Sequence, residues 1–509
     1  MSAQRIRADM AFLADDALEG READTRGYRI AANYVAAQFA QLGLEPAGDD
    51  GSFFQQVPMI AYRPAEHGTF ELQGRTGAPK TLEFGRHVLT EGFPSAGTAR
   101  FDAPLVFAGY GIVAPEWRRN DYRGLDVRGK IVLLLSGSPE GRSGDERAFF
   151  GSTTTKRIEA ARRGAIGVVV IPTPKDEERR PIADRAERWQ AWRMAWRRPD
   201  GSGYVDAPSA PVIAGLGAAA GPLLFGADWP KVVDSAAAGK SLRAGDMGLR
   251  FVAEVKSETR PTVSWNVAAK LPGADRALSS QAIALTAHLD HLGIDPARKG
   301  DTIYNGALDN AVGVATLIEA ARRFSAHPAK PRRSLLFVAM TAEEKGLIGS
   351  DYMSRNPLRG GDIVGLVNLD MPILTYDFRD VIAFGAEHSS IGQSVANAVS
   401  AMGLKTSPDP MPDESLFTRS DHYKFVQQGV PAVFLMTGFA NGGAEKFQGF
   451  LKDCYHRPCD DLAQPLNYTA GARFAWVNYN IARELADADQ PPRWNDGDFF
   501  GRRYAPKPR

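Results

Sequence analysis

The chain has little cysteine, no long apolar run and no excess of charge of either sign. Only Cys454 and Cys459 occur among its 509 residues, which excludes a disulfide-built scaffold and leaves at most one bridge. No stretch approaches the roughly 18 apolar residues that a membrane-spanning helix needs. A formal net charge of +1 gives no electrostatic reason to expect nucleic acid or a membrane surface as a partner. A G-x-S-x-G nucleophile motif is also missing, so the chemistry has to come from other residue types.

The length and the changes in sequence texture favour several domains. A chain of 509 residues is too long for one ordinary core, and 44% apolar with 24% charged residues is typical of a globular protein. Residues 103–255 consist of short apolar runs separated by glycine, which predicts a β-rich module. We expect residues 1–102 to pack with residues 256–488, the part that carries the chemical site, and residues 489–509 to form a C-terminal tail.

Two local patterns outside the site predict helices. Thr25 is a suitable N-cap, and apolar residues then recur at helical spacing as far as Leu42, before Gly43. Residues 177–198 show a charged helical pattern with Trp189, Trp192 and Trp196 on one face. We expect this stripe to pack against another domain or subunit, with a substrate wall or a membrane-surface role as the alternatives.

Three short apolar runs, each followed by metal-binding side chains, organise the rest of the chain. They cover residues 282–290, 334–344 and 363–370, and a helix-like stretch from Ala311 to Phe324 separates the first two. Continuous apolar runs that alternate with helices are typical of buried parallel strands, and the ligand site of such a sheet lies beyond the carboxyl ends of its strands. The sequence therefore predicts an α/β fold with a metal site at this edge of the sheet.

Each acidic or histidine motif has an ordinary explanation when it is considered alone. The residues at issue are His288, Asp290, Asp309, Glu343, Glu344, Asp370 and His456. A His is often only a hydrogen-bonded polar group, an Asp before a helix often caps it, and adjacent glutamates are usually solvated. Taken together, two His, two Asp and one Glu at strand ends form an O/N ligand set suited to Zn²⁺, and one shared carboxylate would allow two ions. A further Glu could then act as general base in amide hydrolysis.

Residues 256–485 resemble the co-catalytic zinc peptidases that include bacterial leucyl aminopeptidase, aminopeptidase Y and glutamate carboxypeptidase II. The ordered motifs H-x-D, D-N, E-E, N-L-D and Y-H are all present, from residue 288 to residue 456. The resemblance implies the zinc-exopeptidase fold, a mixed and largely parallel sheet flanked by helices. Residues 103–255, with Gly109-Tyr-Gly-Ile112, resemble an inserted protease-associated domain, and Leu13 to Arg21 also resembles the start of such bacterial proteins.

The resemblance assigns a role to each residue of the site, with two Zn²⁺ ions as cofactor. Asp309 would bridge the ions, and Glu343 would be the general base, a choice between adjacent glutamates that spacing alone leaves open. Asp290 would orient His288. The bond from Asp309 to Asn310 is a candidate cis peptide. The metal ligands implied are His288 and Asp370 on one ion, Glu344 and His456 on the other, and Asp309 on both; His291 is a rival ligand that does not fit the family pattern.

Further residues near these motifs are candidates for the pocket. Tyr455 could direct its hydroxyl at the developing oxyanion, or it could simply pack. Ser420, Asp421 and His422 resemble a stretch that shapes the pocket in these peptidases, and as consecutive residues they do not make a Ser/His/Asp triad. Cys454 and Cys459 could form a bridge around His456, or remain free thiols.

The prediction is an aminopeptidase acting on peptides, and three alternatives remain open. They are a carboxypeptidase similar to glutamate carboxypeptidase, a glutaminyl cyclase, and a receptor-like binding protein without catalysis. We expect no membrane span and assign no oligomeric state. A periplasmic or secreted location is expected, with a leader absent from this sequence because residues 1–25 are too polar for one; a cytoplasmic location stays open.

Overall fold

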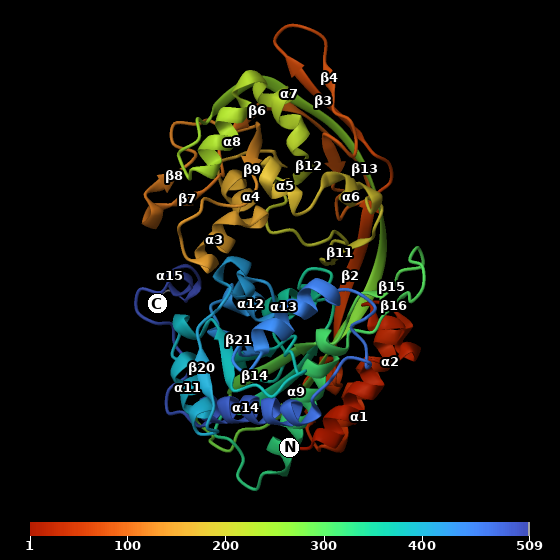
Figure 1. Cartoon of the computed structure of the whole chain (residues 1–509), viewed down its shortest axis with the longest axis vertical. Coiled ribbons are helices and arrows are strands. Elements are labelled where there is room, and N and C mark those ends of the chain that lie inside the picture. Colours follow the sequence, from red (N-terminus) through yellow and green to blue (C-terminus); the bar gives the residue numbers. More distant parts are fainter. Residues whose placement is uncertain (507–509) are drawn as a thin grey trace. The chain divides into compact units, whose positions relative to one another are not determined.

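The structure, a computed structural model, describes residues 1–506 and divides into two compact units (Figure 1). Unit 1 comprises residues 1–58, 263–412 and the chain from Leu416 onward, and unit 2 comprises Met59–Thr262 and Asp413–Ser415. Unit 2 therefore begins well before residue 103, where the glycine-rich texture starts. The reason is that β2 (Phe54–Pro64) pairs there with β11 (Arg193–Trp196), and β3 (Thr69–Gly74) pairs with the first part of β13 (Gly245–Leu271).

Unit 1 is built on a mixed, largely parallel sheet, which confirms the predicted fold class. Strands β17, β14, β18 and β21 are parallel neighbours in that order, and the end of β13 and strand β19 pair antiparallel to the two outer members. Their apolar stretches are buried, as the sequence predicted. The bounds of the strands are β14 Gln281–His288, β17 Ser334–Met340, β18 Asp362–Leu369, β19 Asp380–Phe384 and β21 Ala432–Thr437.

Helices flank this sheet (Figure 1). Helices α9 (Val312–Ala326) and α14 (Tyr468–Asp487) pack on each other and on β14, while α12 (His422–Val426) packs on β18 and β21. Helix α2 (Arg26–Gln41) begins as predicted, because the Thr25 hydroxyl accepts a hydrogen bond from the Tyr28 N–H. No helix within residues 1–506 combines the length and the apolar character that crossing a bilayer requires.

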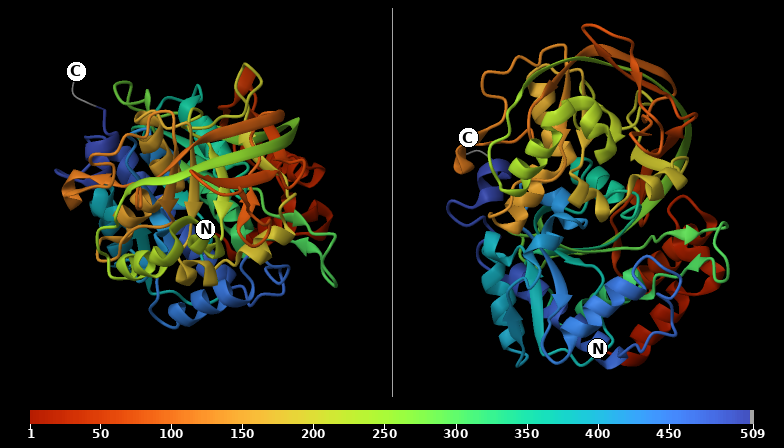
Figure 2. Two further views of the ribbon diagram at one scale, coloured as in Figure 1. Left: turned by 90° about the horizontal axis from the view of Figure 1, so that it is seen from above. Right: turned by 45° about the horizontal axis from the view of Figure 1, so that its top comes forward.

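In unit 2 the first part of β13 pairs antiparallel with β3 and β6 (Gly97–Phe107), which lie beside it as orange ribbons in Figure 2. A parallel set, β6, β9, β10 and β12, continues the layer. A core that includes Val132, Leu134 and Val168 packs beneath α4 (Thr153–Arg162). The predicted strands in residues 129–135 and 164–171 are present as β9 (Ile131–Leu135) and β10 (Gly167–Ile171), and β12 is Val212–Leu216.

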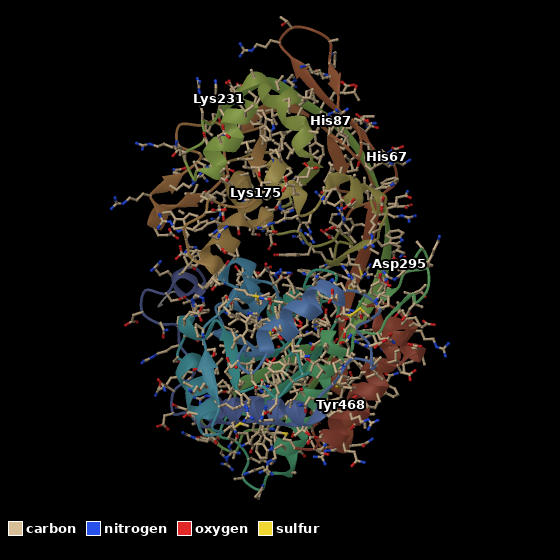
Figure 3. The ribbon with its side chains drawn as sticks, in the orientation of Figure 1. His67, His87, Lys175, Lys231, Asp295 and Tyr468 are labelled. Atoms are coloured by element: carbon tan, nitrogen blue, oxygen red, sulfur yellow. A yellow bond between two sulfur atoms is a disulfide. The ribbon has the colours of Figure 1, made fainter. Side chains whose placement is uncertain are left out.

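The tryptophan stripe predicted on one helix is wrong. Residues 177–198 split into the end of α5 (Pro174–Glu178), α6 (Ile182–Glu187), which begins directly after Pro181, and strand β11. Trp189 packs edge-on against His67, which Figure 3 labels, with ring centroids 4.5 Å apart. The guanidinium of Arg63 lies over Trp192 at 4.4 Å. The tryptophans therefore fill separate places within unit 2.

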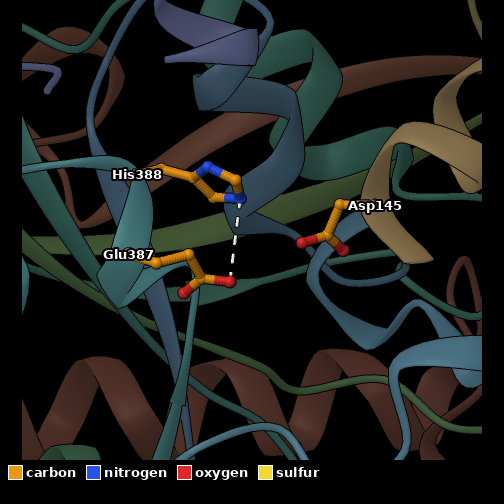
Figure 4. Close-up of side chains that lie close together, drawn as sticks. All are labelled: Asp145, Glu387 and His388. Carbon is orange, nitrogen blue, oxygen red and sulfur yellow. Dashed lines mark ion pairs between the residues drawn. The ribbon is translucent and has the colours of Figure 1, made fainter. Parts of the chain in front are cut away.

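The segment after residue 488 packs on unit 1, so the expectation of a tail is wrong for residues 489–506. Trp494 forms a β-bridge with Ser389, and Phe500 in α15 (Phe499–Tyr504) is fully buried. His388 contacts Asp498 with 2.7 Å between Nδ1 and Oδ2. Its Nε2 lies 3.9 Å from Glu387 Oε1, an ion pair that the dashed line in Figure 4 marks. Residues 507–509 of the predicted tail lie outside the described residues.

A buried lysine in unit 2 gives a testable pH dependence. Lys156 is 1% exposed and donates to the carbonyl oxygens of Leu135 and Gly137, which match the two N–H groups of a neutral amine. Burial lowers the pKa of Lys156 to about 7, although the carboxylates of Asp121 and Asp176 oppose the shift. Between this value and the ordinary pKa near 10.5 the unfolded chain binds more protons, so the free energy of unfolding rises with pH. We expect a gain on the order of 2 kcal/mol from pH 7 to pH 9 in urea denaturation, and a flatter profile for Lys156→Met.

Candidate metal centre

The carboxyl ends of the parallel strands bring the predicted residues together. His288 is the last residue of β14 and pairs in register with Met340 at the end of β17, and Asp370 directly follows β18. Asp309 lies in the turn Ala307–Ala311 before α9, and His456 follows α13 (Gly443–Asp453). Since α9 starts at Val312 without a side-chain cap, Asp309 does not cap a helix. The peptide bond from Asp309 to Asn310 is cis, which confirms the expectation.

The two oxygens of Asp309 face different imidazoles. Nε2 of His288 lies 3.2 Å from Asp309 Oδ1 and 3.2 Å from Asp370 Oδ1. Nε2 of His456 lies 3.3 Å from Asp309 Oδ2 and 3.1 Å from Glu344 Oε2. Ligands at about 2.0–2.2 Å from a tetrahedral zinc ion are themselves about 3.3 Å apart, so all four spacings fit two such centres that share one carboxylate. The chemistry of the donors, two imidazoles and three carboxylates, fits the same metal.

His291 also reaches this cluster, but in a different way. Its Nδ1 lies 2.7 Å from Glu344 Oε1, a hydrogen-bond distance, and 3.9 Å from Asp309 Oδ2. The potential ligand atoms of His291, Asp309 and Glu344 all lie within 4.8 Å of one another, as do those of His288, Asp309 and Asp370. The distances from His456 to Asp309 and Glu344 are close to those expected between two ligands of one ion. The distances from His291 instead fit a side chain that hydrogen-bonds to Glu344 and orients it.

The metal-site segment matches known peptidases. Residues 266–482 match the model of peptidase family M28. The segment that carries the site is therefore similar to the peptidases of that family. The leupeptin-inactivating enzyme 1 of Streptomyces exfoliatus is 30% identical over 219 residues, which are 40% of this chain and 45% of that protein. A probable zinc metalloprotease of Pyrenophora teres f. teres is 29% identical over 136 residues, 23% of this chain and 28% of that protein. The matches thus span less than half the length of these curated relatives.

A solved structure supports the fold over nearly the whole chain. The aminopeptidase from Aneurinibacillus sp. strain AM-1 aligns with a TM-score of 0.52 and 21% identity, covering 96% of both chains. At this identity the likeness shows the fold, and it includes residues 266–482 and the chain on either side of them.

The electrostatics of the site favour a cation. Burial opposes the charged form of His288, but the Asp370 and Asp309 carboxylates outweigh it and raise the pKa of His288 well above 6.5. His456 is likewise opposed by burial, yet Asp309 and Glu344 raise its pKa to about 10. Burial and the Asp309 carboxylate act to raise the pKa of Glu344, but the imidazoles of His291 and His456 outweigh them and lower it to about 2. The carboxylates thus hold positive charge on both imidazoles, in the place where a divalent ion would compete with the protons.

Glu343 and Glu344 differ although they are adjacent. Glu344 contacts both His291 and His456, whereas Glu343 lines the neighbouring cavity. Burial, with the carboxylates of Asp370 and Glu344 adding to it, raises the pKa of Glu343 well above 4.5. A carboxyl group with a raised pKa that faces a cavity is suited to accept and return a proton.

The carboxylate of Asp290 makes other contacts than the sequence suggested. Its Oδ1 accepts from the Glu343 N–H at 3.0 Å and its Oδ2 from the Glu344 N–H at 3.3 Å. The acceptor for His288 Nδ1, at 3.1 Å, is the backbone carbonyl oxygen of Asp290. Asp290 thus links the strand end that carries His288 to the turn that carries the two glutamates, one through its carbonyl and the other through its carboxylate.

Of the three consecutive residues expected to shape the pocket, only Ser420 lines the cavity. Its hydroxyl donates to Asp370 Oδ2 at 2.5 Å and accepts from Asn368 Nδ2 at 2.7 Å. Asp421 and His422 are fully buried. The His422 ring contacts the rings of Phe417 and Phe434, and burial lowers its pKa to about 3. These contacts make Ser420 a partner of a predicted metal ligand and give no sign of a Ser/His/Asp triad.

The cavity beside the cluster has both polar and apolar lining residues, and its volume is about 470 Å³ when the space open to solvent is included. Tyr455 lines it and stacks on His456 with ring centroids 3.8 Å apart. Cys454 and Cys459 form a disulfide that brackets these two residues, which resolves the alternatives for the cysteines. The other lining residues are Met371, Leu416, Arg419, Phe434, Met436 and Phe447.

The sequence motifs did not reveal two buried side chains, Asp460 and Arg21, that hydrogen-bond to the backbone next to the predicted ligands. Asp460 accepts from the backbone N–H groups of Leu308 and Asp309 at 2.8 and 3.0 Å. Arg21, from the N-terminal part of the chain, donates to carbonyl oxygens next to the ligands. Asp460 lies four residues after His456, a signal that could have been noticed, whereas nothing in the sequence relates Arg21 to the site.

Proposed function

We propose that the chain is a zinc-dependent aminopeptidase that binds two Zn²⁺ ions and removes N-terminal residues from peptides. The observation that carries the proposal is the placement of Asp309, whose two oxygens lie 3.2 and 3.3 Å from the imidazoles of His288 and His456. Asp370 would complete the first metal position and Glu344 the second. The match to family M28 supports the metallopeptidase activity, and the zinc metalloproteases among the relatives support the choice of metal.

The proposed roles of the residues follow from their contacts. The bound ions would activate water, polarise the scissile carbonyl group and offset the charge of the oxyanion. Glu343 takes the proton from the attacking water and returns it to the leaving amine, for which its raised pKa is suited. Asp290 fixes the Glu343 backbone, and Ser420 fixes Asp370 through its hydroxyl. Burial raises the pKa of Tyr455, so that its hydroxyl remains protonated and able to donate to the oxyanion.

The cavity supports recognition of an N-terminal residue. The carboxylates of Asp309, Glu343 and Asp370 line it and would accept hydrogen bonds from a substrate ammonium group. The apolar residues that line the remainder would accept a large apolar side chain. Arg419 is the observation that favours the second candidate, a carboxypeptidase, because a guanidinium recognises a carboxylate well.

Blocked peptides distinguish these candidates. We expect release of the first residue from a leucine-initiated peptide whose C-terminus is amidated, and no release from the same peptide with an acetylated N-terminus. Among aminoacyl anilides, leucine should exceed alanine about tenfold or more in kcat/KM, because a buried Leu side chain contributes about 1.5–3 kcal/mol relative to an exposed one. Residues released from the C-terminus of the acetylated peptide would instead support the carboxypeptidase.

Two further assignments belong to this proposal. The disulfide between Cys454 and Cys459 supports a periplasmic or secreted location, because such bonds persist in oxidising compartments. Residues 103–255 would be a protease-associated domain, which the parallel strands β6, β9, β10 and β12 within unit 2 support.

A further inference from the structure

A short N-terminal turn reaches the metal centre of unit 1 from outside the M28 segment. We name Glu19 to Glu22 the Arg21 turn; it closes the helical turn Asp16–Arg21. Glu19, Gly20 and Arg21 have positive φ angles of 53°, 68° and 48°. A Cβ atom on Gly20 would lie 2.4 Å from the carbonyl oxygen of Gly293, so only glycine allows this approach. A backbone of this kind persists where its surroundings determine it, and such places cluster at functional sites.

The guanidinium of Arg21 ends among backbone carbonyl groups of the loops that carry the predicted ligands. Its Nε donates to Leu289 O at 3.0 Å, one residue after His288. Its Nη1 and Nη2 donate to Asn305 O and Gly306 O at 2.5 and 3.1 Å, in the turn that leads to Asp309. Nη1 also donates to Leu13 O. Arg21 is 1% exposed and all of these acceptors are neutral, so a full charge is buried there with no carboxylate of residues 1–506 within hydrogen-bond distance.

The Arg21 turn also contacts His291, in the loop after His288, and Lys345, in the loop that carries the glutamates. The Arg21 carbonyl accepts from the His291 N–H at 3.2 Å, and Glu22 pairs with His291 in a parallel β-bridge. Glu22 also forms an ion pair with Lys345, the residue after Glu344, with 2.6 Å between Oε1 and Nζ. The Arg21 turn thus contacts the loops of His288, Asp309 and Glu344 together.

The charge of Arg21 suits this place. Burial lowers its pKa to about 10, while Asp460, Asp290, Asp309 and Glu344 oppose the shift, so the guanidinium stays charged at neutral pH. A cation behind the acidic cluster partly offsets the repulsion between carboxylates, and its planar fork fixes the distances between the loops. Lysine would keep the charge and lose the fork.

We propose that Arg21 is a positioning residue that holds the loops of His288, Asp309 and Glu344 at the spacing needed to bind two Zn²⁺ ions. This inference rests on the proposed function. Groups behind metal ligands typically contribute tenfold to a hundredfold to metal affinity. Without Arg21 the ligands would remain in the chain, but their carbonyl supports would be released and the metal sites would loosen.

The test compares Arg21→Met with Arg333→Met, a matched control in the same unit. Arg333 is equally buried and donates to Gln281 Oε1 and to backbone carbonyl groups near Leu485 and Ala488, away from the metal centre. We would measure zinc content after dialysis against buffers of graded free Zn²⁺, with melting temperature and kcat/KM on each protein. We expect Arg21→Met to need at least tenfold more free zinc for full occupancy, and Arg333→Met to melt earlier with unchanged zinc affinity.

Two further variants keep the test decisive. If Arg21→Met fails to fold, Arg21→Lys and Glu22→Gln replace it, and both should weaken zinc binding, Glu22→Gln less so because its ion pair with Lys345 is partly exposed. Equal zinc affinity in the Arg21 variants and wild type would overturn the inference while leaving the proposed function intact. Absence of zinc binding and peptidase activity from the wild type would overturn both, so the two failures are distinguishable.

Discussion

Glu343→Gln should lower kcat by about a thousandfold while both zinc ions stay bound, because a positioned general base typically contributes a factor of a hundred to ten thousand. Glutamine preserves the size and the polar character of the side chain but cannot take the proton from water. Glu343 makes no contact with His288 or His456 of the kind that the proposed ligands make, so its loss leaves the metal contacts in place. Steady-state kinetics on a leucyl anilide, with zinc measured on the same samples, would test this result.

The adjacent glutamate provides the contrast. Glu344→Gln removes a carboxylate oxygen that lies 3.1 Å from His456 and 2.7 Å from His291, so we expect it to lose zinc as well as activity. Retained turnover in Glu343→Gln, or zinc loss equal to that of Glu344→Gln, would show that the general base is assigned to the wrong residue.

Asp309→Asn should abolish binding of both ions and reduce peptidase activity to background. The amide offers one oxygen where the carboxylate offers two, so it cannot face both His288 and His456 as a ligand. A ligand at a thousand times its Kd stabilises the folded state by about 4 kcal/mol, so zinc should raise the melting temperature of the wild type and leave that of Asp309→Asn unchanged.

Asp362→Asn is the control for that experiment. Asp362 is exposed at the start of β18, at the opposite end of the strand from Asp370. Its variant should bind zinc and hydrolyse substrate as the wild type does. If Asp309→Asn kept one firmly bound ion, Asp309 would not be the shared ligand and the two metal positions would be independent.

The sequence predicted the parts of the structure that depend on local pattern. Continuous apolar runs predicted β14, β17 and β18, and polar residues at their carboxyl ends were expected to meet because parallel strands end at one edge. The helix capped by Thr25 is likewise present, and the structure decides between the bridge and the free thiols that the sequence left open for Cys454 and Cys459. In each case the signal lies within a few residues of the feature.

The rest depends on contacts between residues far apart in the chain. Arg21 acts on carbonyl groups of Leu289 and Gly306, and no property of residues 19–22 alone reveals those partners. The carboxylate of Asp290 was expected to hold His288, but it accepts from the Glu343 N–H, and His288 Nδ1 contacts the Asp290 carbonyl oxygen instead. Strand register and the packing of loops against one another decide such contacts, and short sequence motifs predict neither.

The helix expected in residues 177–198 failed for a related reason. Spacing of three and four residues between the tryptophans also fits an extended segment that packs on several neighbours. Trp196 lies in β11, where it pairs with Met59 of β2 and stacks on Tyr204 at 4.2 Å. Pairing with a strand far away in the sequence overrode the local helical pattern.

Anomalous scattering at the zinc absorption edge, from crystals of zinc-loaded protein, tests the central claim most directly. The account predicts two peaks about 3.5–4 Å apart, each about 2.0–2.2 Å from one oxygen of Asp309, one beside His288 and Asp370 and the other beside Glu344 and His456. A single peak, or zinc bound away from the Asp309 carboxylate, would contradict it.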